Sequence, residues 1–289
     1  MKKKIKSVTT GYRADIGPHE IYRIMPTSSS KSIGPFVFLD YLPLKKHTTD
    51  KPLTVPGKGA HPHRGIATLT YTLKGEVTHY DSRGNVATIH SGGLQWMKAG
   101  NGIIHDEVIN VDSQTDEKAT QGFQFWINLP STIKAENPEY RSIQASDVPV
   151  LHLSENSGWL KVIVGEYQGL QSIIPNYSKQ FLYHINLAAG KQFTLLTDDH
   201  LEVAAFLYQD KATVNDKELN TAELVVFEKD EGNIEIRNPL NHAIDIILFG
   251  GEKYAEPIIA QGPFVMNTHE EIVDAYEDFY NGKYGQIKY

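Results

Sequence analysis

Two stretches decide the reading of this chain: Gly59-Ala60-His61-Pro62-His63-Arg64-Gly65 and Gly100-Asn101-Gly102-Ile103-Ile104-His105-Asp106-Glu107. Each contains two metal-ligand side chains separated by one residue. Residues i and i+2 of a β-strand point to the same face, so each pair aims its side chains in one direction. The spacing therefore predicts two strands on which His61, His63, His105 and Glu107 converge on one metal ion. Such ligands suit Fe(II), and equally Mn, Ni, Cu or Zn.

The residues after His63 alternate in polarity. The odd positions, from Gly65 through Ala67, Leu69 and Tyr71, are apolar, and most even positions are polar. This alternation is typical of a half-buried strand. If that strand continues from the histidine pair, its odd face, including Ala67, points inward beside the histidines.

A single inward histidine is more often a hydrogen-bonded core residue than a metal ligand. Burying three imidazoles and a carboxylate without a metal would, however, leave polar groups unsatisfied at a cost of ~1–3 kcal/mol each. We therefore favour the metal site.

Composition limits the class of protein. The chain has 289 residues, no cysteine and a formal charge of −7. Disulfides, thiolate zinc sites and cysteine nucleophiles are thereby excluded, and a reducing compartment fits. The charge gives no basis for direct nucleic-acid binding. Neither a signal-peptide core nor an apolar run of ~20 residues is present, so we expect a cytoplasmic protein without a membrane partner.

The spacing of strands and turns predicts the architecture. Short apolar runs at 77–80, 86–90, 94–97 and 122–129 are separated by glycine-rich turns, which is typical of an antiparallel sandwich or barrel. Residues 43–60 read as a long loop that leads into the histidine pair. Residues 130–148 form a connector, and a similarly paced series follows from 159 to 249. We predict an N-terminal metal-binding barrel at 1–135 and a second barrel without metal at 136–289.

The tail predicts one helix. Asn267 or Thr268 can cap it, and Thr268 and Glu271 have capping-box spacing. The packing face is expected from the helically spaced residues that follow: Ile272, Val273, Tyr276, Phe279 and Tyr280.

The chain resembles the pirin family of the cupin superfamily. The resemblance rests on His61-Pro62-His63-Arg64-Gly65, on the segment from Gln95 to Glu107, and on Gly262-Pro263-Phe264-Val265-Met266-Asn267-Thr268. Gly34-Pro35-Phe36 is similar to the family's entry strand. The resemblance implies an all-β bicupin of two antiparallel jelly-roll barrels with a short C-terminal helix. It also implies a mononuclear metal, usually iron, on His61, His63, His105 and Glu107.

The resemblance implies a quercetin 2,3-dioxygenase-like oxidoreductase that acts on a small aromatic substrate and O₂. Glu107 is the candidate base, by analogy with quercetinases. Many relatives carry a glutamate where this chain has Ala67, which puts the transfer of substrate from relatives in question. Residues expected near the pocket are Phe36, Phe38, Trp96, Met97, Gln124 and Trp126, although alternation allows only some of them to face inward.

Two alternatives remain open because a fold alone does not decide function. One is a metal-binding regulatory module of the transcriptional co-regulator type that contacts a protein partner without turnover. The other is a cupin enzyme with a different substrate.

Overall fold

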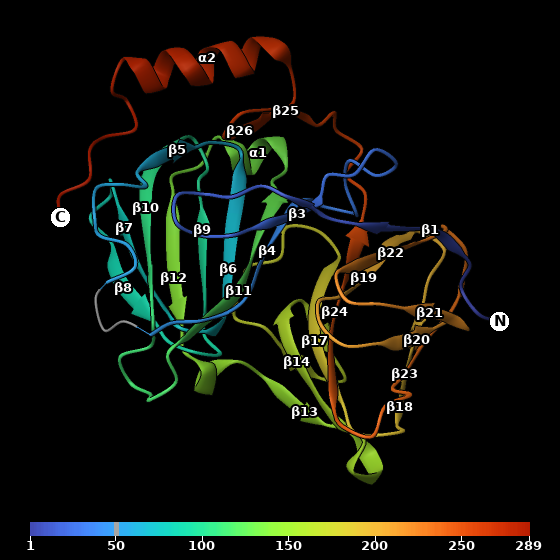
Figure 1. Ribbon diagram of the computed structural model, residues 1–289. Coiled ribbons are helices and arrows are strands. Elements are labelled where there is room, and N and C mark those ends of the chain that lie inside the picture. The colour runs from blue at the N-terminus through green and yellow to red at the C-terminus, as the bar shows by residue number, and fades with distance from the viewer. Residues whose placement is uncertain (49–51) are drawn as a thin grey trace. The chain divides into compact units, whose positions relative to one another are not determined.

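The computed structural model describes residues 1–48 and 52–289 and consists mostly of antiparallel strands (Figure 1). Its α-helices are α1 (Ser131–Lys134) and α2 (His269–Tyr280). Neither is long and apolar enough to cross a membrane. The predicted all-β class with a C-terminal helix is confirmed.

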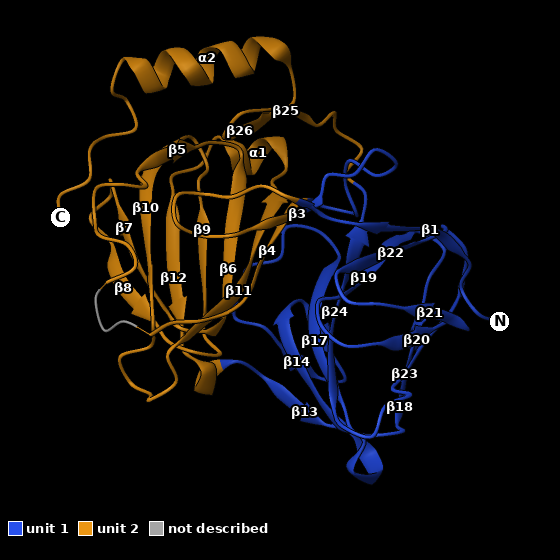
Figure 2. Ribbon diagram, viewed as in Figure 1, with its two compact units in different colours: residues 1–12, 23–37, 148–253 blue, residues 13–22, 38–147, 254–289 orange. Residues whose placement is uncertain are grey.

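The described chain forms two compact units, each assembled from separate segments (Figure 2). Unit 1 comprises Met1–Tyr12, Arg23–Val37 and Val148–Lys253, and unit 2 comprises Arg13–Tyr22, Phe38–Asp147 and Tyr254–Tyr289. The division predicted at 135 and 136 stays a prediction, and the compact units do not follow a single cut. Of the loop predicted at 43–60, residues 49–51 lie outside the described residues.

Unit 2 is built on two antiparallel sheets. The strands of the first, in hydrogen-bonded order, are β12 (Glu139–Ile143), β9 (Leu94–Lys98), β6 (Ile66–Lys74), β11 (Ala119–Asn128), β4 (Phe36–Lys46), β3 (Tyr22–Met25) and β2 (Tyr12–Arg13). Of these, β4, β3 and β2 each include residues of unit 1. Those of the second are β5 (His61–His63), β10 (Ile103–Asn110), β7 (Glu76–Asp81) and β8 (Val86–Ile89). A hairpin of β25 (Ile259–Gln261) and β26 (Phe264–Met266) precedes α2.

Strand β6 is buried on both faces, so its polarity alternation does not separate inside from outside. Thr70 lines the cavity of unit 2 and contacts Glu107 of the opposite sheet. Ala67, three residues earlier in a regular strand, therefore points to the other face.

The prediction that the odd face continues from the histidines is thus wrong. Gly65 separates β5 from β6 with a φ of 82°, and the two strands belong to different sheets. The alternation of side-chain direction along β5 therefore does not continue into β6. The alanine at position 67 therefore removes no carboxylate from the cavity.

Helix α2 begins as predicted. Of the two candidate caps, the structure uses Thr268, whose hydroxyl accepts from the Glu271 amide while the Glu271 carboxylate accepts from the Thr268 amide. Ile272 is buried, as expected. The wider packing face is wrong in part, because Val273 and Tyr280 are 56% and 78% exposed.

Unit 1 has its own apolar core, with Leu160, Ile185 and Leu248 fully buried. Its large sheet contains, in order, β1 (Ile5–Thr10), β22 (Glu223–Phe227), β19 (Leu201–Leu207), β24 (Ile244–Glu252), β17 (Gln180–Leu187), β14 (Gly158–Val164) and β13 (Val150–His152). A second sheet contains β18 (Gln192–Thr197), β23 (Gly232–Arg237), β20 (Ala212–Val214) and β21 (Lys217–Leu219). The remaining elements are β15 (Glu166–Tyr167), β16 (Leu170–Gln171) and the short 3₁₀ turns Ala145–Asp147 and Ser154–Asn156.

Candidate metal centre

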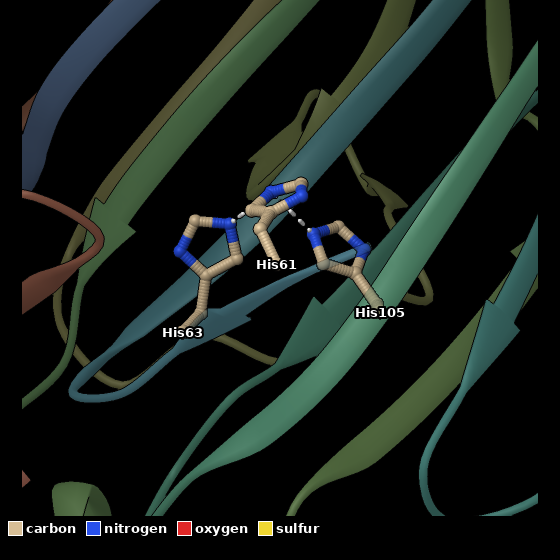
Figure 3. Close-up of side chains that lie close together, drawn as sticks. All are labelled: His61, His63 and His105. Carbon is tan, nitrogen blue, oxygen red and sulfur yellow. Dashed lines mark hydrogen bonds between the residues drawn. The ribbon is translucent and has the colours of Figure 1, made fainter. Parts of the chain in front are cut away.

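Three imidazoles meet at one end of the second sheet of unit 2 (Figure 3). Strand β5 carries His61 and His63, and its antiparallel pairing places His105 of β10 directly opposite His61. The Nε2 atom of His61 lies 3.0 Å from Nε2 of His63 and 3.1 Å from Nε2 of His105. One ligand-type nitrogen from each of the three residues lies within 4.8 Å of the other two. The sequence prediction that these histidines converge therefore agrees with the geometry.

Backbone carbonyls fix two of the three rings. Nδ1 of His61 lies 2.7 Å from the Gly59 carbonyl oxygen, and Nδ1 of His63 lies 3.0 Å from that of Pro263. A carbonyl only accepts, so each Nδ1 must be the protonated nitrogen, which leaves the Nε2 lone pairs facing the common centre. Nδ1 of His105 is buried and has no hydrogen-bond partner within residues 1–48 and 52–289.

Burial keeps the inner histidines neutral. His63 and His105 are each 1% exposed. Desolvation, together with the neighbouring His61, lowers the pKa of His63 to about 3, and the same causes lower that of His105 well below its usual range. Neutral imidazole is the form that binds a metal ion.

A divalent metal fits this arrangement. Two nitrogen lone pairs facing each other at 3.0 Å repel unless a cation or a proton lies between them. With metal–nitrogen bonds of ~2.1 Å, two ligands at a right angle stand about 3.0 Å apart. The spacing of His61, His63 and His105 matches that value. Nitrogen donors alone do not select one transition metal from another.

Glu107 occupies a neighbouring position. The group of mutually close ligand atoms contains the three histidines and does not include Glu107. Its Oε1 accepts hydrogen bonds of 2.5 Å from the Thr70 hydroxyl and from the Gln95 side-chain amide. Tyr140 donates in turn to Oε1 of Gln95 at 2.9 Å. The carboxylate is therefore held by a polar network next to the histidines.

A cavity of about 350 Å³ opens beside the histidines and Glu107. Phe38 and Trp126 stack on its wall with ring centroids 4.2 Å apart, and Trp126 also packs edge-on against His63. Thr70 and Gln124 supply polar lining next to Glu107. An aromatic wall beside a few polar groups suits a flat, apolar ligand with hydrogen-bonding substituents.

Three of the six residues expected near the pocket line the cavity, namely Phe38, Gln124 and Trp126. Phe36 packs instead against Phe249 within unit 1. Trp96 is buried on the other face of β9 beneath Arg141. Met97 packs in a small core cluster with Ile103.

Sequence reasoning missed several contributors. Residues of the N-terminal loop line the cavity although nothing in their composition indicates this, namely Ile16, Gly17, Pro18, His19 and Ile21. Thr70 and Gln95, which hold Glu107, could be found only by placing the sheet of β6 and β9 opposite the sheet of β10. The Pro263 carbonyl lies 200 residues from His63 in sequence.

A second cluster of ligand-type residues lies at the other end of the same sheet. Glu76, His90 and Asp112 come close together, with Nδ1 of His90 3.0 Å from Oδ1 of Asp112. The Ser91 and Ser113 amides donate to Asp112 and Glu76, respectively. This cluster connects the strand ends by hydrogen bonds.

Comparison with known proteins places the chain in a family. Residues 19–127 match the family model described as Pirin, and residues 182–285 match the Pirin C-terminal cupin domain. A Pseudomonas aeruginosa protein provisionally named a quercetin 2,3-dioxygenase is 34% identical over 254 residues, covering 87% of each chain.

Solved structures agree. A quercetin 2,3-dioxygenase from Acinetobacter baumannii superposes with a TM-score of 0.89 at 30% identity and covers 100% of both chains. A bacterial pirin from Escherichia coli in complex with nickel(II) has a TM-score of 0.64 at 19% identity, covering 87% of this chain and 98% of that one, and shares the fold. The bicupin fold expected from the sequence is thereby confirmed, and the chain belongs to the pirin family.

Proposed function

We propose that this protein is a metal-dependent dioxygenase that cleaves quercetin or a related flavonol with O₂. The observation that carries the proposal is the convergence of three imidazoles beside an aromatic-walled cavity and a carboxylate. The likeness to proteins named as quercetin 2,3-dioxygenases supports the reaction class.

In this proposal His61, His63, His105 and Glu107 hold one divalent metal, with Fe(II) the first choice. The three imidazoles are the principal ligands, because their Nε2 atoms already share a centre. When bound, the ion acidifies the substrate hydroxyl that it contacts and provides the redox-active centre for reaction with O₂.

The cavity would orient the flavonol. The stacked Phe38 and Trp126 offer a flat apolar surface against which a fused aromatic ring packs. Gln124 stands next to Thr70 and presents a polar amide to ring substituents. The apolar wall also keeps water away from the deprotonated substrate.

Glu107 would act as the general base. Its Oε1 is occupied by Thr70 and Gln95, so Oε2 is the oxygen that would both contact the metal and accept the proton of the substrate hydroxyl. The anion left on the substrate is electron-rich and reacts with O₂. The ring then opens, both oxygen atoms are retained in the product, and carbon monoxide leaves.

The test is quercetin consumption with carbon monoxide release by protein loaded anaerobically with Fe(II) and then exposed to O₂. His63→Ala is the matched control, since it removes a ligand whose ring is fully enclosed. We expect turnover in the wild type and none in the variant.

The opposite result has a defined meaning. If the wild type binds one metal per chain and neither consumes quercetin nor releases carbon monoxide, the quercetinase assignment fails. The remaining candidates would then be a metal-binding regulatory protein or a cupin enzyme for another substrate.

A further inference from the structure

We propose that the C-terminal segment from Ile259 to Tyr284 is a working part of the metal centre, and that Asp278 is a positioning residue for His63. The inference rests on the proposed metal site and concerns the hydrogen bonds that hold one of its ligands. The segment follows the second barrel in sequence but belongs to unit 2, where β26 lies beside β5 (Figures 1 and 2).

The first link is direct. The carbonyl of Pro263, in the turn between β25 and β26, accepts the Nδ1 proton of His63 at 3.0 Å. This contact decides which nitrogen of the ring carries the proton, and so directs the Nε2 lone pair toward His61. It is the only hydrogen bond to His63 Nδ1 among the described residues, so His63 depends on a residue 200 positions away.

The second link joins the same hairpin to the residue that follows His63. The Val265 amide donates to the Arg64 carbonyl at 3.1 Å, and Arg64 and Phe264 form an isolated parallel bridge. Lys134 of α1 donates to the Val265 carbonyl at 2.9 Å. The turn at Pro263 is thus fixed relative to β5 by its backbone on one side and by a buried lysine on the other.

The third link is an ion pair. The Arg64 guanidinium donates to Oδ2 of Asp278 at 2.8 Å and lies 3.4 Å from the Tyr284 hydroxyl. The Asp278 side chain is 23% exposed and that of Arg64 is 19% exposed, so water screens this pair only in part. Asp278 also accepts from Lys283 at 2.6 Å.

Close packing leaves the segment little freedom to move. A Cβ at Gly65 would stand 1.9 Å from the Val265 carbonyl oxygen, and one at Gly102 would stand 2.1 Å from the Tyr284 ring. Tyr284 is 2% exposed, and its hydroxyl donates to the Ala275 carbonyl at 2.8 Å. Strand β26 and Tyr284 therefore pack against the turns at Gly65 and Gly102, next to the histidine strands, without space for a shift.

Together these links make α2 a support for His63. Loss of the charge at Asp278 frees the Arg64 guanidinium, loosens α2 against β5 and weakens the hold of the Pro263 carbonyl on the imidazole. Removal of a group that orients a metal-binding histidine weakens metal binding by about 10–100-fold. Because Asp278 contacts Arg64 and not His63 itself, we expect metal affinity to fall by an amount near the lower end of that range.

The experiment compares Asp278→Asn with Asp274→Asn, which makes the same charge change at an exposed position of the same helix. Zn(II) affinity of the full-length proteins is measured by competition with a chromophoric chelator, well below the unfolding temperature. We expect Asp278→Asn to bind Zn(II) about 10-fold more weakly than the wild type, and Asp274→Asn to match the wild type. Asp278→Glu keeps the charge and should recover most of the affinity.

A second readout reports the His63 ring itself. In Zn(II)-loaded protein with ¹⁵N-labelled histidine, the Nδ1 protons of His61 and His63 are both held by carbonyls. Asp278→Asn should speed solvent exchange of the His63 proton and leave that of His61 unchanged. A general loss of stability would affect both protons.

Equal Zn(II) affinities and equal His63 exchange in Asp278→Asn and Asp274→Asn overturn the inference. If Asp278→Asn fails to fold, Tyr284→Phe, which removes only the hydroxyl contacts, is measured instead and should also weaken Zn(II) binding. Neither assay uses turnover, so a failed quercetin assay leaves this result standing, and the reverse holds as well.

Discussion

At the scale of single residues, Glu107 differs from the histidines because side chains already hold its carboxylate. We predict that Glu107→Gln keeps one metal per chain, because His61, His63 and His105 remain and glutamine can still accept from Thr70 and Gln95. Flavonol turnover should fall at least ~100-fold, since the amide cannot take the substrate proton. Elemental analysis with an O₂-uptake assay checks both quantities, and wild-type turnover in the metal-loaded variant would contradict the role of Glu107.

Lys134 offers a residue-scale test of stability against pH. Burial lowers the pKa of Lys134 to about 8, opposed by Glu271 and Glu256, whereas the unfolded chain has a lysine pKa near 10.5. Between these values the unfolded chain binds the extra proton, so folding stability rises with pH in this window.

Lys134→Met removes that titration. The free energy of unfolding of the wild type minus that of Lys134→Met should therefore increase by up to ~3 kcal/mol from pH 8 to pH 10.5. Urea unfolding at several pH values gives this difference directly. A difference that stays flat across the window would show that Lys134 titrates normally in the folded protein.

At the scale of elements, the turn between β5 and β6 sets how the ligand strand meets the C-terminal hairpin. Gly65 and Gly84 both have φ near 90°, but only Gly65 has backbone where a Cβ would stand. Gly84→Ala should cost about 1 kcal/mol, from backbone strain alone. Gly65→Ala should cost at least ~3 kcal/mol, because Val265 must also move. Similar unfolding free energies for the two variants would show that the β25–β26 hairpin can move away from position 65 at little energetic cost.

The same turn marks the limit of what sequence patterns could predict. Local spacing identified the strand pairs that carry His61, His63 and His105, because i and i+2 geometry holds within one strand. It misplaced Ala67, because a left-handed glycine ends one strand and starts another in a different sheet. Pro263 and Thr70 could not be assigned, because their roles depend on pairing between distant segments.

At the scale of the whole molecule, the chain places the proposed metal ligands, the groups that hold them and the cavity in one unit. The histidines, Glu107, the Pro263 turn and α2 all belong to unit 2, although they are drawn from the middle and the end of the sequence. Unit 1 has a separate apolar core. Metal binding should therefore be a local event, stabilising the unit that contains the donors.

This organisation predicts where metal changes backbone protection. At a free Zn(II) concentration 100 times the Kd, binding stabilises the folded site by about 2.7 kcal/mol. Hydrogen exchange measured by mass spectrometry should then slow in β5, β10 and the β25–β26 hairpin, since Pro263 connects the hairpin to a ligand. Strands β17 and β24 of unit 1 should exchange equally with and without Zn(II). His63→Ala is the control, and slowing in β17 and β24 that disappears in this variant would show that metal binding reaches beyond unit 2.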